Sequence, residues 1–147
     1  MVALETQLSE DFQAAFWAAK RAMADAGEAA FQRHGVRSGQ QWILRCLWAE
    51  DALTPGEVAR RLELSTPTVT KAATRMELVG LIERRPHATD ARLVLLCLTD
   101  RGRALEAAIA AEMHELGVRA LSSLDNDERA ALVRYLTDIR RNLVTSA

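Results

Sequence analysis

The stretch TPGEVARRLELSTPTVTKAATRMEL, residues 54–78, decides the fold of this chain. Thr54 and Glu57 have the spacing of a capping box, in which the threonine hydroxyl accepts from the Glu57 backbone N–H and the carboxylate reaches back. Pro55, between them, suits the first helical position. Ser65 begins a second helix in the same way, again with proline in its first turn. The stretch therefore predicts two short helices, one ending near residue 62 and one from about residue 66 to residue 78, joined as a helix-turn-helix.

A β-hairpin is predicted directly after the second helix, which stops at Gly80. The segments 81–85 and 92–98 have the character of short strands, and the polar loop PHATDA, residues 86–91, separates them. A hairpin in this place is typical of the wing of a winged helix-turn-helix.

Long helices are predicted on both sides of this core. Over residues 5–32, apolar side chains recur at three- and four-residue steps, which is the period of one helix face. Ser38, Thr99 and Asp125 are expected to cap three further helices. The first helix would be roughly 40 Å long at 1.5 Å per residue. This is longer than a compact domain needs, so we expect part of it to contact a partner subunit.

These elements predict a mainly α fold with a minor β part: a winged helix-turn-helix with long N- and C-terminal dimerisation helices. The chain is expected to form a single domain over residues 1–147. Within it, residues 36–103 are the winged helix-turn-helix core, and residues 1–35 and 104–147 are the helical dimerisation region.

Composition places the chain among packed soluble proteins. Hydrophobic residues make up 49% and charged residues 27%, which is too apolar for a disordered chain and too evenly charged for a membrane-spanning one. The chain starts without the pattern of a signal peptide, and two cysteines are too few for a disulfide framework, so a cytoplasmic location is expected. The net charge of −1 hides an uneven distribution, because residues 60–103 carry 9 basic and 5 acidic side chains.

The basic middle segment predicts an interface with double-stranded DNA. The second helix of the helix-turn-helix can lie in a major groove about 12 Å wide and present its N-terminal side chains to base edges. Its threonines combine a donor, an acceptor and a methyl group, and its free N–H groups favour phosphate. Arginines of the wing suit a narrow minor groove or the DNA backbone. The predicted DNA-binding residues are Ser65, Thr66, Thr68, Thr70, Lys71, Arg75, Arg84, Arg85, His87, Asp90 and Arg92.

Several runs within residues 36–105 carry a resemblance to a known family. These are LTPGEVARRL (residues 53–62), STPTVTK (residues 65–71), GLIER (residues 80–84) and, most specifically, Asp90-Ala91-Arg92 followed by LTDRG (residues 98–102). In these runs the chain resembles the multiple-antibiotic-resistance regulator (MarR) family of bacterial winged-helix transcription factors. The resemblance implies that Arg92 enters the minor groove and that Asp90 orients it. It further implies a homodimeric transcriptional regulator, more often a repressor than an activator, on a near-palindromic operator.

The chain departs from the family pattern at two places. Leu78 and Val79 stand at the end of the recognition helix, where the family often has basic residues, and Ala91 stands at a wing position that is often basic too. Both departures predict weaker phosphate contacts or an altered site preference, and we expect specific binding to depend more on shape and symmetry.

The resemblance also implies a small effector, because family members often bind phenolic or other aromatic anions between their dimerisation and DNA-binding parts. Such a pocket needs apolar walls and a cation. The candidate ligand-binding residues are Phe16, Trp17, His34, Arg37, Trp42 and Arg45. The tryptophans can equally be core residues and the arginines surface residues.

No cofactor, catalytic residue or metal site is predicted. The chain lacks a phosphate-binding loop and the motifs of catalytic nucleophiles. Its histidines are too scattered for a set of metal ligands. Two alternatives stay open: a thiol- or metal-responsive regulator, in the thiol case acting through Cys46 or Cys97, and a winged-helix module that binds a protein.

Overall fold

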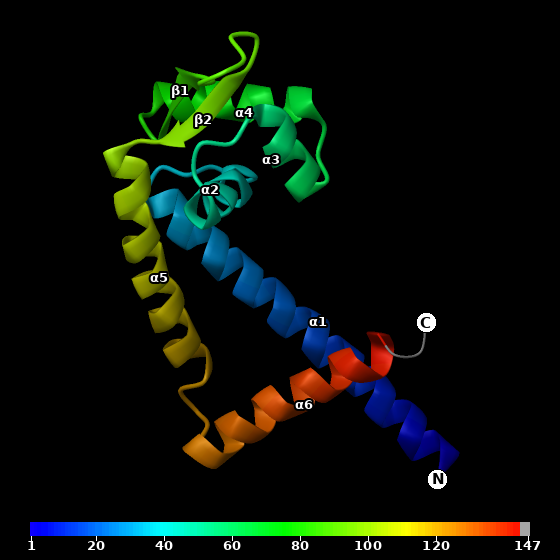
Figure 1. The fold of residues 1–147 in the computed structure, drawn as a ribbon. Coiled ribbons are helices and arrows are strands. Elements are labelled where there is room, and N and C mark those ends of the chain that lie inside the picture. Colours follow the sequence, from blue (N-terminus) through cyan, green and yellow to red (C-terminus); the bar gives the residue numbers. More distant parts are fainter. Residues whose placement is uncertain (145–147) are drawn as a thin grey trace. The chain divides into compact units, whose positions relative to one another are not determined.

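The computed structural model describes residues 1–144, which form a mainly helical structure with a small antiparallel sheet (Figure 1). The elements are α1 (Val2–Arg33), α2 (Gln40–Ala49), α3 (Pro55–Leu62), α4 (Thr66–Leu78), β1 (Ile82–Pro86), β2 (Val94–Leu98), α5 (Asp100–Ala120) and α6 (Asn126–Val144). The predicted mainly α winged helix-turn-helix is confirmed. The last three residues of the predicted C-terminal dimerisation region, 104–147, lie outside the described residues.

The chain divides into two compact units. The first spans Met1–Met113 and contains α1 to α4, the hairpin and the first turns of α5, while the second begins at His114 and contains the end of α5 and α6. The predicted core, residues 36–103, lies within the first unit. Among residues 1–144, no helix has the length and apolar character needed to cross a membrane.

Local hydrogen bonds build the helix-turn-helix as the sequence predicts. Thr54 Oγ1 accepts from the Glu57 N–H at 3.2 Å, and the Glu57 carboxylate accepts from the Thr54 N–H at 2.7 Å. Helix α3 ends at Leu62, and the left-handed conformation of its C-cap Glu63 (φ 54°) turns the chain. Ser65 Oγ then accepts from the Thr68 N–H at 3.2 Å and starts α4.

Two of the three other predicted caps are present. Thr99 Oγ1 accepts from the Gly102 N–H at 3.0 Å in α5, and Asp125 Oδ1 accepts from the Glu128 N–H at 2.9 Å in α6.

The predicted cap at Ser38 is wrong. Helix α2 begins one residue later, with Gly39 as its N-cap and no side-chain cap bond. Gly39 has φ 89°, a conformation that glycine adopts without the steric penalty of a Cβ. The Gln40 side-chain oxygen instead accepts from the Arg37 N–H at 3.0 Å, which satisfies the backbone before the helix.

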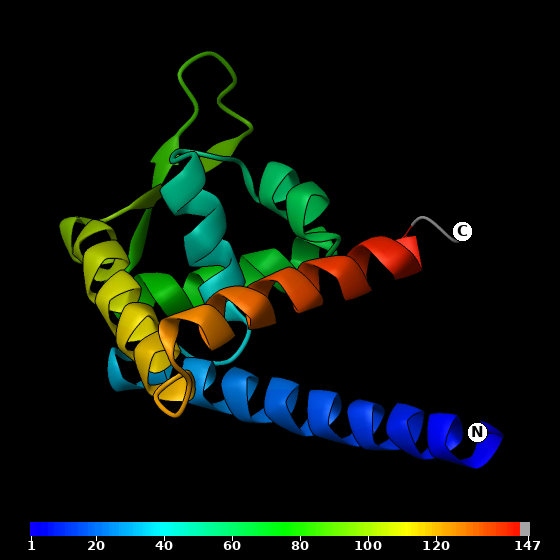
Figure 2. The same ribbon diagram turned by 90° about the horizontal axis from the view of Figure 1, so that it is seen from below.

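The hydrophobic core of the first unit holds the recognition helix in place. Val69, Ala73 and Met76 form the inner face of α4 and are completely buried, together with Ile43 and Leu44 of α2. Burying an aliphatic side chain of this kind contributes about 1.5–3 kcal/mol. Helix α4 is therefore fixed along its length, whereas the loop between β1 and β2 projects beyond the helices of this unit (Figures 1 and 2).

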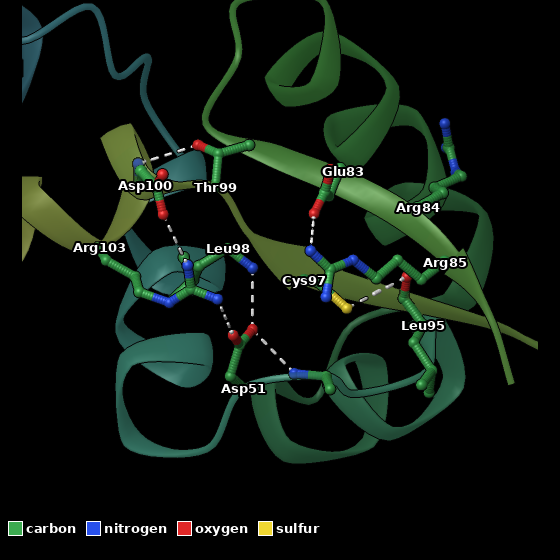
Figure 3. Close-up of polar contacts among 12 residues, drawn as sticks. Asp51, Glu83, Arg84, Arg85, Leu95, Cys97, Leu98, Thr99, Asp100 and Arg103 are labelled. Atoms are coloured by element: carbon green, nitrogen blue, oxygen red, sulfur yellow. Dashed lines mark hydrogen bonds and ion pairs between the residues drawn. The ribbon is translucent and has the colours of Figure 1, made fainter. Parts of the chain in front are cut away.

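Asp51 connects the loop between α2 and α3 to the base of the hairpin (Figure 3). Its carboxylate accepts from the N–H groups of Ala52 at 2.8 Å and Leu98 at 2.9 Å, and it pairs with Arg103 of α5 at 3.3 Å. Because one carboxylate bonds three elements, the root of the wing is firmly attached to the core.

Candidate nucleic-acid interface

The outer face of α4 carries the residues that the sequence predicts for DNA contact. Val69, Ala73 and Met76 point into the core, and the other side of the helix is exposed. The predicted residues on this exposed side are Ser65, Thr66, Thr68, Thr70, Lys71 and Arg75. They begin at the helix N-terminus, where free N–H groups and the helix dipole favour a phosphate.

Lys71 and Arg75 are one helical turn apart on this face. Among residues 1–144, neither forms an ion pair with a carboxylate, although the same unit contains several paired arginines. Two cations without an acidic partner on an exposed helix face keep their full charge for an external anion.

Ser65 and Thr68 already use part of their bonding capacity within the helix. Besides capping the Thr68 N–H, the Ser65 hydroxyl lies 2.7 Å from the Thr68 hydroxyl. These two residues therefore define the start of the helix, and each keeps an exposed oxygen that can accept a further bond.

Asp90 holds the Arg92 guanidinium at the tip of the wing. Its carboxylate accepts from Arg92 Nε at 3.1 Å, from Nη2 at 3.0 Å and from the Arg92 backbone N–H at 3.1 Å. The Arg92 hydrogen bonds hold the pKa of the Asp90 carboxyl below its usual range. Because 89% of the Arg92 side chain is exposed while its fork is fixed, the arginine is oriented toward solvent before any partner arrives.

The His87 ring stabilises the wing loop by hydrogen bonds to the loop backbone. Its Nδ1 accepts from the backbone N–H groups of Thr89 at 3.2 Å and Asp90 at 3.1 Å. This geometry requires a ring whose Nδ1 carries no proton. The structure thus places this predicted DNA-binding residue where it shapes the loop that presents Arg92.

The two arginines of β1 both have acidic partners. Arg85 pairs with Glu83 on its own strand, and the side chains lie together beside Cys97 (Figure 3). Arg84 extends on the other side of the strand and bonds Glu77 of α4. Both predicted DNA-binding arginines are therefore already engaged within the protein, in contrast to Lys71 and Arg75.

Sequence reasoning missed Thr74 as a member of this surface. Thr74 is exposed on α4, and its hydroxyl donates to the Thr70 carbonyl at 3.0 Å. The signal was available, because Thr74 follows Thr70 by one helical turn and shares its face.

The six candidate ligand-binding residues fall into separate places. Phe16 and Trp17 contact each other on α1, with ring centroids 5.2 Å apart, and the His34 ring bonds Glu112 of α5. Arg45 lies over the rings of Trp42 and Phe31, at 5.5 and 5.6 Å.

Arg37 and Trp42 are brought together at a cleft of about 490 Å³ between the start of α2 and α4. Lys71 and Arg75 line the same cleft. Arg45 instead lines a different cavity, of about 350 Å³, with Trp48 and Glu106. The structure therefore groups two of the six candidates with the cations of the recognition helix.

Neither cysteine lies in surroundings that would activate its thiol. Burial raises the pKa of the Cys46 thiol despite the nearby Arg61, and burial also raises the pKa of the Cys97 thiol. A raised pKa lowers the fraction of reactive thiolate. Among residues 1–144, no three His, Cys, Asp or Glu side chains are grouped as metal ligands.

Comparison with known sequences identifies relatives of the same kind. Residues 38–94 match the model described as the MarR family. The chain is 32% identical over 129 residues to the HTH-type transcriptional regulator TtmR of Methylorubrum extorquens, which covers 88% of this chain and 65% of TtmR. It is also 32% identical over 106 residues to the HTH-type transcriptional regulator MgrA of Staphylococcus aureus, which covers 72% of this chain and 71% of MgrA. The chain thus spans slightly less than two thirds of TtmR.

The fold also matches a solved protein–DNA complex. A point mutant of MepR from Staphylococcus aureus, bound to an oligodeoxyribonucleotide, superposes with a TM-score of 0.74 at 25% identity, covering 90% of this chain and 97% of MepR. These relatives agree with the geometry of the site. The N-terminus of α4 is exposed, Lys71 and Arg75 have no acidic partner within residues 1–144, and the wing presents Arg92 to solvent. The chain belongs to the MarR family of HTH-type transcriptional regulators, and it is a DNA-binding protein rather than an enzyme.

Proposed function

We propose that this protein acts as a homodimeric repressor on a near-palindromic operator and that a small anionic effector releases it. In each half-site, α4 enters the major groove and Arg92 reaches into the adjacent minor groove. The two half-sites then lie about one helical turn apart, roughly 34 Å. Twofold symmetry of the dimer accounts for the symmetry of the operator.

The observation that carries the proposal is the preset Arg92 guanidinium, which donates two hydrogen bonds to Asp90 and is almost wholly exposed, while the Arg92 backbone N–H donates a third. An exposed ion pair is worth little for stability, about 0–1 kcal/mol. Its geometry matters for recognition, because an arginine that is already ordered loses less side-chain entropy on binding. Lys71 and Arg75, which have no acidic partner within residues 1–144, supply the phosphate contacts on α4.

Exposed apolar side chains on the terminal helices support a dimer of two copies. In α1 the exposed large apolar side chains are Val2, Leu4, Leu8, Phe12, Trp17 and Met23. Helix α6 contains no buried residue, and its exposed large apolar side chains are Val133, Tyr135, Leu136, Leu143 and Val144. Apolar surface on this scale marks an interaction site. A second copy presents the same apolar surface, so each chain covers that of its partner.

Operator titrations over a range of salt concentrations test the proposal. On a duplex taken from the protein's own promoter region, we expect two chains per duplex and a log–log salt slope of about −5. That slope corresponds to six cationic contacts, those of Lys71, Arg75 and Arg92 in each chain, at about −0.9 each. Mobility shift with calibrated stoichiometry measures both quantities, and a duplex carrying one half-site is the control.

Three outcomes would overturn the proposal. Absence of binding at low salt or an affinity independent of salt would exclude the DNA interface. Equal affinity for the palindrome and the single half-site would exclude symmetric binding by a dimer.

The effector part of the proposal is supported by the 490 Å³ cleft. Arg37 supplies a cation at its edge, Trp42 an aromatic wall, and Lys71 and Arg75 belong to the DNA-binding face as well. An aromatic carboxylate in this cleft would neutralise cations that otherwise bind phosphate. It would therefore compete directly with DNA.

Benzoate is a suitable probe of this cleft. We expect it to raise the apparent operator Kd in proportion to its concentration, and we expect Arg37→Ala to raise the benzoate concentration for half-release about tenfold, because one charged contact contributes about 1.5–3 kcal/mol. Arg45→Ala alters the other cavity and also removes the cation over the Trp42 ring, so it is the comparison for loss of an arginine that does not line the cleft itself. A larger effect of Arg45→Ala than of Arg37→Ala would indicate that the effector binds in that other cavity. Unchanged operator binding in the presence of benzoate would refute the effector part of the proposal.

A further inference from the structure

Arg84 forms a bridge between the wing and the recognition helix. Its Nη1 bonds the Glu77 carboxylate, its Nη2 donates to Thr74 Oγ1 at 2.9 Å and to the Thr70 carbonyl at 3.4 Å, and its backbone N–H donates to Glu77 Oε1 at 3.3 Å. All of these acceptors belong to α4. One side chain of β1 therefore contacts two successive turns of the helix.

The acceptors lie along one line of α4. Residues 70, 74 and 77 are spaced by four and three positions, so they share a face that runs along the helix. The guanidinium fork is planar and its donors have fixed directions. Contacts at several points along this line restrict rotation of β1 about the helix as well as its distance from it.

The accessible surface of Arg84 differs sharply from that of Arg92. Of the Arg84 side chain 27% is exposed, against 89% for Arg92. Both terminal nitrogens of Arg84 already donate to the protein, and the Glu77 carboxylate offsets its charge. A phosphate contact by Arg84 would require these bonds to break.

We infer that Arg84 is a positioning residue for DNA binding: it sets the place of the Arg92 wing relative to α4. The core fixes α4 through Val69, Ala73 and Met76, whereas the wing loop projects from the hairpin. Loss of the bridge consequently lets the outer part of the wing shift relative to α4, while Asp51 still holds its root and the core holds the helix. The inference rests on the proposed use of α4 and Arg92 in adjacent grooves.

Substitutions at both ends of the bridge test this role. Arg84→Ala is expected to raise the operator Kd about tenfold with an unchanged salt slope, because Arg84 neutralises no phosphate. Glu77→Gln is expected to raise the Kd three- to fivefold. If Arg84 bound phosphate instead, its removal would reduce the magnitude of the slope by about 0.9 for each phosphate that it had neutralised. Glu77→Gln would then strengthen binding, because it frees a cation and removes a negative charge. Either of these results would overturn the inference.

Two further variants separate positioning from loss of charge or of stability. Arg84→Lys keeps the charge but loses the fork, so it is expected to behave like Arg84→Ala rather than like the unaltered chain. Arg33→Ala breaks an arginine–glutamate pair between α1 and α5, away from the wing, and is the matched control with operator affinity within twofold of the unaltered chain. Near-normal affinity of Arg84→Lys would favour a simple charge effect and contradict positioning.

A double-mutant cycle with Arg92→Ala gives the decisive readout. In the Arg92→Ala background, Arg84→Ala is expected to cost less than twofold, because there is no longer a wing arginine to misplace. An independent DNA contact or a general loss of stability would give the full tenfold effect in both backgrounds. Full additivity therefore refutes the inference while leaving the proposed function intact. An Arg92→Ala variant that binds normally refutes the proposed use of the wing itself.

Discussion

Arg92→Ala is expected to weaken operator binding about 100-fold. A well-placed arginine contact in a groove contributes about 1–3 kcal/mol, and the proposed dimer has two wings, so the losses combine to about 2.7 kcal/mol. The free protein loses only an exposed ion pair with Asp90, so its stability and the proposed dimer should remain unchanged. Fluorescence anisotropy with a labelled operator measures the affinity, and sedimentation measures the dimer.

Asp90→Asn is the matched variant for orientation. It keeps an acceptor near Arg92 but removes the charge-assisted pair, so an intermediate loss of affinity is expected. The lowered pKa of Asp90 gives the sign of any pH effect: the pair is present above the ordinary carboxyl range and is lost only as the pH falls through the lowered pKa. The orientation of Arg92 should therefore not change with pH near neutrality. Unchanged operator affinity in Arg92→Ala would exclude the wing from DNA binding.

Gly102→Ala is expected to destabilise the protein by about 2 kcal/mol, the upper end of the cost of overpacking less the gain in helix propensity. Gly102 lies in the first turn of α5, where alanine alone would favour the helix by about 1 kcal/mol. A Cβ there would collide with the backbone carbonyl of Leu81 and would lie 3.2 Å from Leu98 Cδ2. The Leu81 carbonyl accepts from the Thr99 N–H at 3.2 Å and from the Thr99 hydroxyl at 3.1 Å, so it has little freedom to move. Overpacking of this kind costs about 1–3 kcal/mol or more and outweighs the helix propensity.

Gly117→Ala is the control in the same helix. Nothing lies within 4 Å of a Cβ built at Gly117, so helix propensity alone should act, with a gain of about 0.5–1 kcal/mol. Urea unfolding followed by circular dichroism, at one chain concentration for all variants, measures both effects. A Gly102→Ala variant as stable as the unaltered chain would show that the contact between α5 and Leu81, in the turn between α4 and β1, is loose.

The sequence was most informative where partners are close along the chain. The capping box of Thr54 and Glu57 and the cap at Ser65 depend on spacings of three residues, and both are present. The Asp90–Arg92 pair spans two residues and is also present. The one wrong cap, at Ser38, failed because glycine at the next position adopts a positive φ and begins the helix itself.

Contacts between distant segments were beyond sequence reasoning. The sequence predicts Arg84 as a DNA-binding arginine of the wing. Only the packing of β1 on α4 shows that its donors bind Glu77, Thr70 and Thr74. The candidate ligand residues are scattered for the same reason. Only the approach of α2 to α4 places Arg37 and Trp42 beside Lys71.

The sequence by itself determined the helix-turn-helix and the wing, because caps, helix periodicity and short loops depend on neighbouring residues, and its resemblance to the MarR family implied that Asp90 orients Arg92. The tertiary structure decided which cations remain available to DNA. Lys71 and Arg75 have no acidic partner within residues 1–144, whereas Glu77 and Glu83 hold the two arginines of β1. A guanidinium bound to a carboxylate must break that bond before it can bind phosphate. The number of cationic side chains available to bind DNA therefore depends on which arginines the fold places beside carboxylates.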